Sequence, residues 1–384
     1  MALGLTAGAA RGVLRLQHCG NCGGVQYPPR EVCGTCLSAV LHWRDTNGAG
    51  ELLARTAIRY GQELYFRERG PWPTGLVRLD VGPNLIVAVH GDCGSPPTRV
   101  RVVAALDKAG QAMLIALPEK DTPNMADDPI MRETSCDPKF RKVLVSDGKT
   151  AMGRAIVGAM LAAEAKMVWV GYAQPWKSSI HLDHLRNLPK VTLVPLDVTD
   201  EASVRELSGG IGAKVDILVN TAEHHRIEGV SGYGVETARA EMDVNYLGLL
   251  RLAQSFAPAL KARAADGPAS AVAWVNVLSV YALSNLPTHA TFSASKAAAL
   301  SLSQALRADL QASGIRLVNV FPGPIDDEWN QLVLPPKLSP AALAAAIVEA
   351  LKGGVEDVYP GDVAKDWLAR FLDNPKALER EAAG

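Results

Sequence analysis

Four of the six cysteines lie close together near the N-terminus, in two Cys-x-x-Cys pairs. In each pair glycine follows the first cysteine, which favours a turn tight enough for two sulfurs to face one ion. Four thiolates in tetrahedral geometry complete the coordination shell of Zn²⁺ and leave no position open for water. The spacing predicts a structural zinc site, with adjacent His18 as a neighbour and not a ligand, formed by Cys19, Cys22, Cys33 and Cys36.

Two alternative interpretations of this cluster stay open. The same four thiolates can hold an iron centre, although nothing else in the chain suggests electron transfer. The four cysteines can also be unrelated residues without a metal. Cys93 and Cys136 stand alone, and neither has neighbours that identify a nucleophile, so we interpret both as buried or incidental thiols.

Cysteine usage and the distribution of apolar residues also indicate a compartment. Unpaired thiols beside a metal cluster fit a reducing environment better than a disulfide framework. No apolar run approaches the roughly eighteen residues that a membrane span needs. Residues 1–10 lack the basic segment that begins a secretory signal. We therefore expect a cytoplasmic protein without a membrane segment.

The elements that must position these residues change character along the chain. Residues 50–118 alternate apolar and polar side chains between glycines and prolines, as in Leu76-Val77-Arg78-Leu79-Asp80-Val81, which predicts a small all-β barrel or sandwich. Residues 119–141 show neither helical nor strand periodicity and are interpreted as a linker.

From residue 142 onward, strand-like and helical patterns alternate. This alternation predicts an α/β fold with a doubly wound parallel sheet. The predicted strands are 142–145, 167–170, 191–196, 215–219, 271–278 and 315–321, and the predicted helices are 152–163, 237–264 and 293–313.

Composition and charge narrow the function classes. The chain has 384 residues, 48% of them apolar, and can bury a sizeable core, which excludes a disordered scaffold. Its formal charge of −1 sums two unequal parts: residues 1–118 carry 12 basic and 8 acidic side chains, a net of +4, and the remainder carries −5. Eleven of those 12 basic residues are arginine, which suits the phosphates of coenzyme A as well as those of nucleic acid.

Several motifs follow one another around and after the cysteine pairs: Leu16-Gln17-His18-Cys19, Tyr27-Pro28-Pro29-Arg30, Trp43, Gly48-x-Gly50 and Leu76-Val77-Arg78-Leu79-Asp80. With these motifs, residues 14–118 resemble the zinc-ribbon plus OB-fold proteins that associate with acyl-CoA enzymes. The resemblance implies a zinc ribbon with an N-terminal arm over 1–48 and an OB-fold barrel over 49–118, docked on a thiolase-like subunit with acyl-CoA near the barrel. An OB barrel can instead hold single-stranded nucleic acid, but we expect no such ligand.

A second series of motifs follows residue 142: Val143-Leu144-Val145, Leu196-Asp197-Val198-Thr199, Val219-Asn220-Thr221-Ala222, Asn245, Asn276-Val277-Leu278-Ser279, Ser293-Ala294-Ser295-Lys296 and Phe321-Pro322-Gly323-Pro324. With these motifs, residues 142–384 resemble the short-chain dehydrogenase/reductase family, which implies a Rossmann domain after a linker over 119–141.

The sequence departs from this family where the cofactor would bind. The family's phosphate loop is Gly-x-x-x-Gly-x-Gly, which lets the backbone approach a pyrophosphate at a helix N-terminus. Here Asp147 and Ala151 occupy the first two positions, and only Gly153 remains. A side chain at either position crowds the diphosphate, and a carboxylate also repels it.

Two further cofactor elements are altered. The second predicted strand ends Val170-Gly171-Tyr172-Ala173, without the acidic or basic residue that the family places on the ribose. The Asn-Asn-Ala-Gly element is Asn220-Thr221-Ala222-Glu223, so a carboxylate replaces glycine, while Asp197, the expected adenine neighbour, is present. We therefore expect zinc as the bound cofactor and no binding of NAD(P), with Gly153, Asp197 and Asn220 as vestiges.

The resemblance also implies the reaction centre, in which a tyrosine transfers the proton, a lysine lowers its pKa and a serine orients the carbonyl. Ser279, Lys296 and Asn245 match that pattern, but Phe292 stands at the tyrosine position. We interpret the three matching residues as vestigial, holding helices and loops in place. Alternatives are a relocated acid at Tyr281 or His289, and a metal site at Glu223-His224-His225.

These features predict a non-catalytic or auxiliary subunit of a thiolase or aldolase complex that cleaves or forms a C–C bond in a 3-oxoacyl-CoA. The degenerate reductase domain is expected to act as a scaffold, pairing with itself or with an active reductase through the helices at 237–264 and 293–313. The alternative is an NAD(P)-dependent reductase that acts on acyl-CoA with a relocated proton donor.

Overall fold

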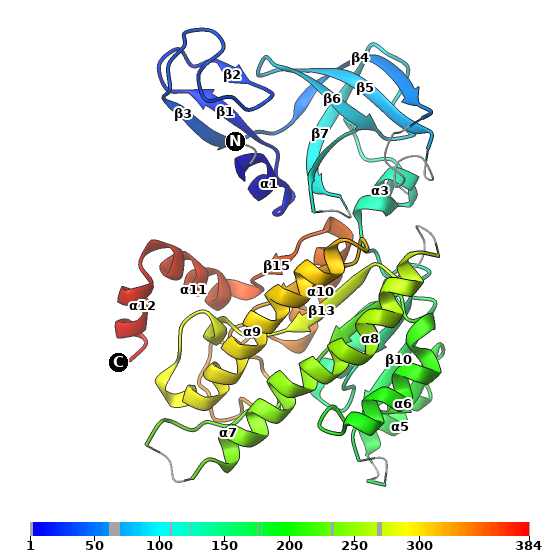
Figure 1. Ribbon diagram of the computed structural model, residues 1–384, viewed down its shortest axis with the longest axis vertical. Coiled ribbons are helices and arrows are strands. Elements are labelled where there is room, and N and C mark those ends of the chain that lie inside the picture. The colour runs from blue at the N-terminus through cyan, green and yellow to red at the C-terminus, as the bar shows by residue number, and fades with distance from the viewer. Residues whose placement is uncertain are drawn as a thin grey trace. The chain divides into compact units, whose positions relative to one another are not determined.

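The computed structural model describes residues 3–60, 70–107, 110–123, 125–174, 176–177, 179–231, 234–266 and 271–383. The chain forms two compact units: Met1–Ser135 with Gly353–Val355, and Cys136–Lys352 with Glu356–Gly384 (Figure 1). Among the described residues, no helix is both long and apolar enough to cross a membrane.

The first unit begins with helix α1 (Leu3–Ala9) and a three-stranded antiparallel sheet. Strand β1 (Arg15–Cys19) lies in the middle, between β2 (Val25–Gln26) and β3 (Leu41–Asp45). Leu16 of β1 is buried in the same hydrophobic core as the strands that follow. Residues on both sides of position 48, the predicted domain boundary, therefore contribute to one core.

The second part of this unit is a closed five-stranded barrel, β4-β5-β6-β8-β7. All neighbouring strands are antiparallel except β6 and β8, which are parallel. Alternate side chains point inward, for example Leu85, Val87 and Val89, because successive residues of a strand face opposite sides. The strands are β4 (Ala49–Ile58), β5 (Trp72–Leu79), β6 (Asn84–Val89), β7 (Thr98–Leu106) and β8 (Ala112–Pro118).

The segment predicted as a linker contains two short helices. These are the 3₁₀ helix η1 (Met125–Asp127) and α3 (Pro129–Thr134), whose N-cap Asp128 accepts the backbone N–H of Ile130 at 2.8 Å. The division between the units follows residue 135. A helix of six residues is too short to produce a visible 3.6-residue period, which is why the sequence did not indicate it.

The second unit contains a seven-stranded parallel sheet, β11-β10-β9-β12-β13-β14-β15. This confirms the predicted doubly wound sheet, whose order reverses between β9 and β12. Helices α8 and α9 lie side by side across one face of it (Figure 1). The strands are β9 (Lys142–Val145), β10 (Met167–Tyr172), β11 (Val191–Pro195), β12 (Ile217–Asn220), β13 (Ala273–Val277), β14 (Arg316–Val320) and β15 (Asp357–Val358).

One of the three helices predicted in this unit is divided in the structure, and the unit contains further helices. The helix predicted over 237–264 is interrupted by a π-helical turn, η3 (Met242–Leu247), which separates α7 (Glu236–Glu241) from α8 (Gly248–Ala264). The remaining helices are α4 (Ala151–Ala162), α5 (Ile180–Arg186), α6 (Glu201–Ile211), α9 (Ala290–Gln311), α10 (Pro340–Gly353), α11 (Gly361–Asp373) and α12 (Pro375–Glu381), with short 3₁₀ helices η2 (Gly212–Lys214), η4 (Val280–Ala282) and η5 (Pro287–His289).

Candidate functional site

The four clustered cysteines converge on one point beside β1. The Sγ atoms of Cys19 and Cys36 are 3.5 Å apart, those of Cys22 and Cys33 are 3.6 Å apart, and all four lie within 4.8 Å of one another. A tetrahedral ion with Zn–S bonds of about 2.3 Å places its sulfurs about 3.8 Å apart, so the geometry fits zinc. His18 is not a member of this group.

The backbone that shapes the two cysteine loops differs from the expectation. The glycine after each first cysteine was expected to allow the turn, but the left-handed residues follow the second cysteines: Gly23 with φ +72° and Leu37 with φ +62°. Their N–H groups donate to the carbonyls of Cys19 and Cys33 at 3.1 and 3.0 Å. Backbone N–H groups of Cys36 and Thr35 pointing at the Cys33 sulfur lower the pKa of that thiol to about 6, which favours the thiolate that binds metal.

The other two cysteines are buried away from this cluster. Burial raises the pKa of the Cys93 thiol to about 11, and its Sγ donates to the carbonyl of Ala116 at 3.4 Å. The Sγ of Cys136 donates to the carbonyl of Val272 at 3.4 Å. The guanidinium of Arg316 also lies 3.7 Å from the Cys136 sulfur.

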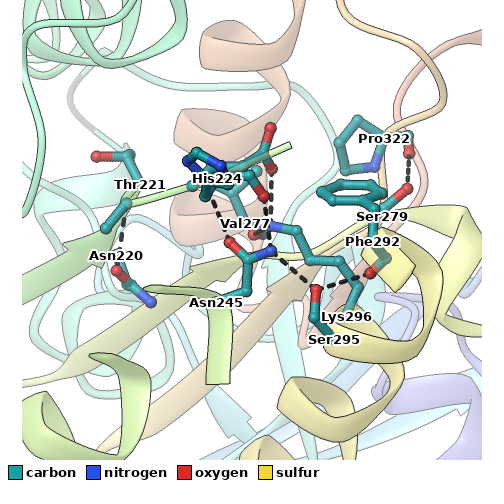
Figure 2. A network of polar contacts seen from close by, with 12 residues as sticks. Asn220, Thr221, His224, Asn245, Val277, Ser279, Phe292, Ser295, Lys296 and Pro322 are labelled. Atoms are coloured by element: carbon teal, nitrogen blue, oxygen red, sulfur yellow. Dashed lines mark hydrogen bonds and ion pairs between the residues drawn. The ribbon is translucent and has the colours of Figure 1, made fainter. Parts of the chain in front are cut away.

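Three residues predicted as a vestigial reaction centre come together at the carboxyl edge of the parallel sheet (Figure 2). Ser279 follows β13, Asn245 lies in the π-helical turn, and Lys296 lies on α9; all three are buried. The Ser279 hydroxyl is engaged by the protein itself, since Oγ lies 3.5 Å from the Pro322 carbonyl and accepts the N–H of Tyr281 at 3.2 Å.

The Asn245 side chain forms hydrogen bonds within the protein through both its amide nitrogen and its oxygen. Its amide Nδ2 donates to the carbonyl of His224 at 2.9 Å and to the Ser295 hydroxyl at 2.8 Å, while its Oδ1 accepts the backbone N–H of His224 at 3.0 Å (Figure 2). Asn245 lies in the π-helical turn, and its side chain contacts the loop after β12. Asn245 therefore joins that loop to α9.

Lys296 is held by two partners inside the protein. Its Nζ lies 2.7 Å from a carboxylate oxygen of Glu223 and donates to the carbonyl of Val277 at 3.1 Å. The side chains of Lys296 and Glu223 are only 2% and 5% exposed. The ammonium charge is thus neutralised by the residue that replaces a glycine of the family's Asn-Asn-Ala-Gly element.

At the tyrosine position, the Phe292 ring stacks on the imidazole of His225, with centroids 3.8 Å apart and planes at 20°. His225 is 3% exposed, and neither ring nitrogen has a hydrogen-bond partner. Tyr281 and His289, the candidate relocated acids, lie nearby: the His289 ring is 5.6 Å from Tyr281 and 5.0 Å from His225. Burial raises the pKa of Tyr281 to about 12, so its hydroxyl is a weak acid.

In the sequence, His225 is recognisable only as part of the possible metal-binding run Glu223-His224-His225. Among the residues that the structure describes, the four cysteines form the only group of His, Cys, Asp or Glu side chains with metal-binding geometry, so the run at 223–225 does not form one. A small pocket beside Phe292 is instead walled by Glu223, His225, Ser279 and Asn330.

The loop that should receive a diphosphate is filled by carboxylates. Asp147 accepts the backbone N–H of Lys149 at 2.8 Å, and burial raises the pKa of Asp147 to about 6. At the start of α4, the N–H of Ala151 donates to both carboxylate oxygens of Glu328, each at 3.1 Å. These residues do not fit a dinucleotide phosphate, because the Glu328 carboxylate accepts the helix N–H that would bind it.

The remaining residues that were predicted to be vestigial make contacts within the fold. A Cβ atom on Gly153 would lie 2.0 Å from the carbonyl oxygen of Asp147, so packing requires glycine here. Asn220 Oδ1 accepts the Ser146 hydroxyl at 2.9 Å. Asp197 Oδ1 accepts the N–H and the hydroxyl of Thr199 at 2.9 and 2.6 Å.

Two family models match the chain. Residues 141–335, just over half of it, match the model described as short chain dehydrogenase. Residues 6–42 match the model described as ChsH2, rubredoxin-like zinc ribbon domain. The second match supports zinc at the four cysteines.

Curated relatives match the second unit. The short-chain dehydrogenase PC-15 of Penicillium crustosum is 38% identical over 149 residues, which cover 38% of this chain and 52% of that protein. The chain therefore spans about half the length of this relative. An uncharacterized oxidoreductase of Staphylococcus haemolyticus, SH0585, is 27% identical over 217 residues, 55% of this chain and 90% of that protein.

Solved structures of short-chain dehydrogenases also match the chain. A short chain dehydrogenase from Burkholderia cenocepacia in complex with NADP has a TM-score of 0.58 and 31% identity, and the match covers 65% of this chain and 99% of that one. A short-chain dehydrogenase from Streptomyces avermitilis, at 24% identity and TM-score 0.55, supports the fold. With a family match over half of its length, the chain belongs to the short-chain dehydrogenase family and carries a rubredoxin-like zinc ribbon of the ChsH2 type at its N-terminus.

Proposed function

We propose that the chain is a non-catalytic or auxiliary subunit of an acyl-CoA-processing complex. The ribbon and barrel dock a thiolase-like enzyme that cleaves or forms a C–C bond in a 3-oxoacyl-CoA, and the dehydrogenase-type domain acts as a scaffold. The observation that carries this proposal is the buried Lys296–Glu223 ion pair beside Phe292. A phenyl ring has no proton to transfer, and the lysine that would activate a phenol is already neutralised.

Electrostatics at the phosphate loop support the same function. Asp147 places a carboxylate in this loop, and Glu328 places one at the start of α4. A dinucleotide carries a negative diphosphate, and like charges in a partly buried site repel strongly. We therefore keep the prediction that NAD(P) does not bind the wild-type chain.

The first unit supplies the docking part of the proposal. The strand order β4-β5-β6-β8-β7 with one parallel pair supports the OB-fold interpretation of the barrel. Three barrel arginines, Arg78, Arg99 and Arg101, are paired with carboxylates, and Arg99 forms two bonds of 2.7 Å with Asp80. These pairs leave less free positive charge for a nucleic-acid strand. Acyl-CoA near the barrel is part of the proposal.

Co-expression of the full chain with a thiolase-like acyl-CoA enzyme tests the docking. Leu37 on the ribbon is an apolar side chain that is 75% exposed, and Leu372 on α11 is 73% exposed. Asparagine tolerates the positive φ of Leu37, so Leu37→Asn changes the surface without straining the backbone. We expect Leu37→Asn to weaken co-purification and Leu372→Asn to preserve it. Equal recovery of all three proteins would contradict docking through this face of the ribbon.

The scaffold role is tested by measuring the oligomeric state of the chain. In the proposal, the dehydrogenase-type domain pairs with itself or with an active reductase through α8 and α9. Light scattering of the full chain alone, and then with the reductase, reports the mass of the assembly. A monomer in both experiments would remove the scaffold part of the proposal while leaving thiolase docking to the co-purification test.

A second candidate function is an NADP-dependent oxidoreductase acting on an acyl-CoA. The observation that favours it is the 31%-identical Burkholderia enzyme, which was solved in complex with NADP. Fluorescence titration with NADPH, followed by an assay with a 3-oxoacyl-CoA, separates the two functions. A low-micromolar dissociation constant with hydride transfer by the wild-type chain would overturn the scaffold proposal.

A further inference from the structure

We propose that the exposed Glu328 carboxylate occupies the N-terminal end of α4 and competes with a nucleotide phosphate for it. Both of its carboxylate oxygens lie 3.1 Å from the backbone nitrogen of Ala151, the first residue of this 12-residue helix. The inference rests on the proposed function and deepens it, because it names a side chain, besides Asp147, that opposes nucleotide binding.

The start of α4 is suited to hold an anion. The N-cap Thr150 already accepts the N–H of Gly153 at 3.0 Å, so the N–H of Ala151 is a donor that the helix itself does not satisfy. The helix dipole adds a partial positive charge at the same place. Glu328 supplies the negative charge that these groups favour, from a position 177 residues further along the chain.

The segment that carries Glu328 is held in place. Its two ends are joined by a β-bridge between Ile325 and Leu338, with Asp326 N–H donating to the Leu338 carbonyl at 2.8 Å. Next to Glu328, Asp327 Oδ1 accepts the N–H groups of Trp329 and Asn330 at 3.1 and 3.2 Å. This turn is ordered by its own hydrogen bonds and presents Glu328 to α4.

Contacts beyond the turn fix it further. The guanidinium of Arg226 lies 5.0 Å from the centre of the Trp329 ring. The His224 ring meets the same Trp329 ring edge to face, with the ring centres 5.5 Å apart. Both residues belong to the loop after β12 that also contains Glu223. The same loop that neutralises Lys296 therefore supports the segment that closes the start of α4.

Nucleotide entry requires the Glu328 carboxylate to leave the Ala151 N–H, so the two anions compete for one donor. Removing the charge while keeping the shape shifts this competition toward the nucleotide. Glu328→Gln does this, and Glu349→Gln is the matched control because Glu349 is an exposed acid of the same domain, 3.8 Å from Lys352.

The experiment is a fluorescence titration of the full chain with NADPH, combined with hydrogen exchange at the first turn of α4. We expect the Kd of Glu328→Gln to be at least ten-fold lower than that of the wild type and of Glu349→Gln. We also expect faster exchange at α4 in the nucleotide-free Glu328→Gln protein, slowed again by NADPH.

Equal dissociation constants in the three proteins, or no binding by any of them, would overturn the role of Glu328. Tight binding by the wild type would overturn it as well. Failure of the proposed function is recognised separately, by hydride transfer from NADPH to a 3-oxoacyl-CoA or by loss of the thiolase partner.

Discussion

The Nζ of Lys296 lies 2.7 Å from a carboxylate oxygen of Glu223, and both side chains are almost completely buried. The pair lies against the ring of Phe292, 5.4 Å from the lysine nitrogen. Three positions that the family resemblance connects with cofactor and proton transfer are thus occupied by an internal ion pair and an inert ring. The domain has the short-chain dehydrogenase fold, and within it Lys296 is paired with Glu223.

The first prediction concerns this ion pair. Glu223→Gln leaves the Lys296 charge buried without a counter-ion, which costs about 3–5 kcal/mol in the free energy of unfolding. Urea unfolding followed by circular dichroism measures the loss. The control Glu349→Gln breaks an exposed pair with Lys352 and is expected to cost less than about 1 kcal/mol.

The double variant Glu223→Gln, Lys296→Met tests the reason for that cost. It replaces the uncompensated charge with an apolar side chain, so it is expected to recover most of the stability. If the double variant is as unstable as Glu223→Gln alone, the loss comes from packing and not from the buried charge.

The second prediction concerns the tyrosine position. Phe292→Tyr supplies a phenol, but Lys296 remains neutralised by Glu223 and Ala151 remains bound to Glu328. We expect no NADPH oxidation with acetoacetyl-CoA by this variant, and an unfolding temperature within a few degrees of the wild type because the ring retains its place on His225. Measurable turnover by Phe292→Tyr would show that the missing hydroxyl is the only obstacle.

The parts of the structure that could be predicted are those indicated by short sequence patterns. The two cysteine pairs and the β–α alternation are visible within short windows, so the zinc site and the parallel sheet could be predicted. The barrel's strand order could not, because it depends on pairings between distant segments such as β6 and β8. The π-helical turn at Asn245 was also hidden, since its apolar pattern continues that of the flanking helices.

In the candidate site too, features within a short stretch of sequence could be predicted, and contacts between distant residues could not. The loss of the tyrosine is visible at Phe292, because the spacing to Ser279 and Lys296 is fixed along the chain. The bond between Ala151 and Glu328 spans 177 positions, so no spacing rule indicates it. The stacking of His225 on Phe292 likewise follows from the fold, which brings the loop after β12 against α9.

The third prediction concerns the metal. Elemental analysis is expected to find about one zinc ion per chain. Cys33→Ser removes one ligand of a closed site, so zinc is lost, and proteolysis of the ribbon increases because metal binding and folding are coupled. Leu16 of the ribbon shares its core with the barrel, so the barrel becomes less stable as well. Cys93→Ser, which alters a buried thiol outside the cluster, is the control and retains the zinc; iron in place of zinc would contradict the assignment.

The fourth prediction concerns acid stability. Burial is the main cause that lowers the pKa of His225 to about 4, and Lys296 and Arg226 add to it. In the unfolded chain this pKa is 6.5, so the unfolded state binds the proton first as the pH falls. The contribution of neutral His225 is complete above pH 6.5 and is lost progressively between pH 6.5 and pH 4, by about 3 kcal/mol in all.

Several buried carboxyl groups oppose this effect in the wild-type curve, among them Glu241 and Glu356, whose pKa values are raised by burial. Burial raises the pKa of Asp147 and of Asp327 to about 6, from 3.8, so their protonation stabilises the folded state between pH 6 and pH 4. The contribution of His225 must therefore be isolated by comparison with His225→Phe, which keeps an aromatic ring on Phe292. The stability advantage of the wild type over this variant is expected to shrink by about 3 kcal/mol from pH 7 to pH 4 in urea unfolding. For the exposed control His181→Phe the two curves stay parallel, and parallel curves for His225→Phe as well would show that His225 is not held neutral by its burial.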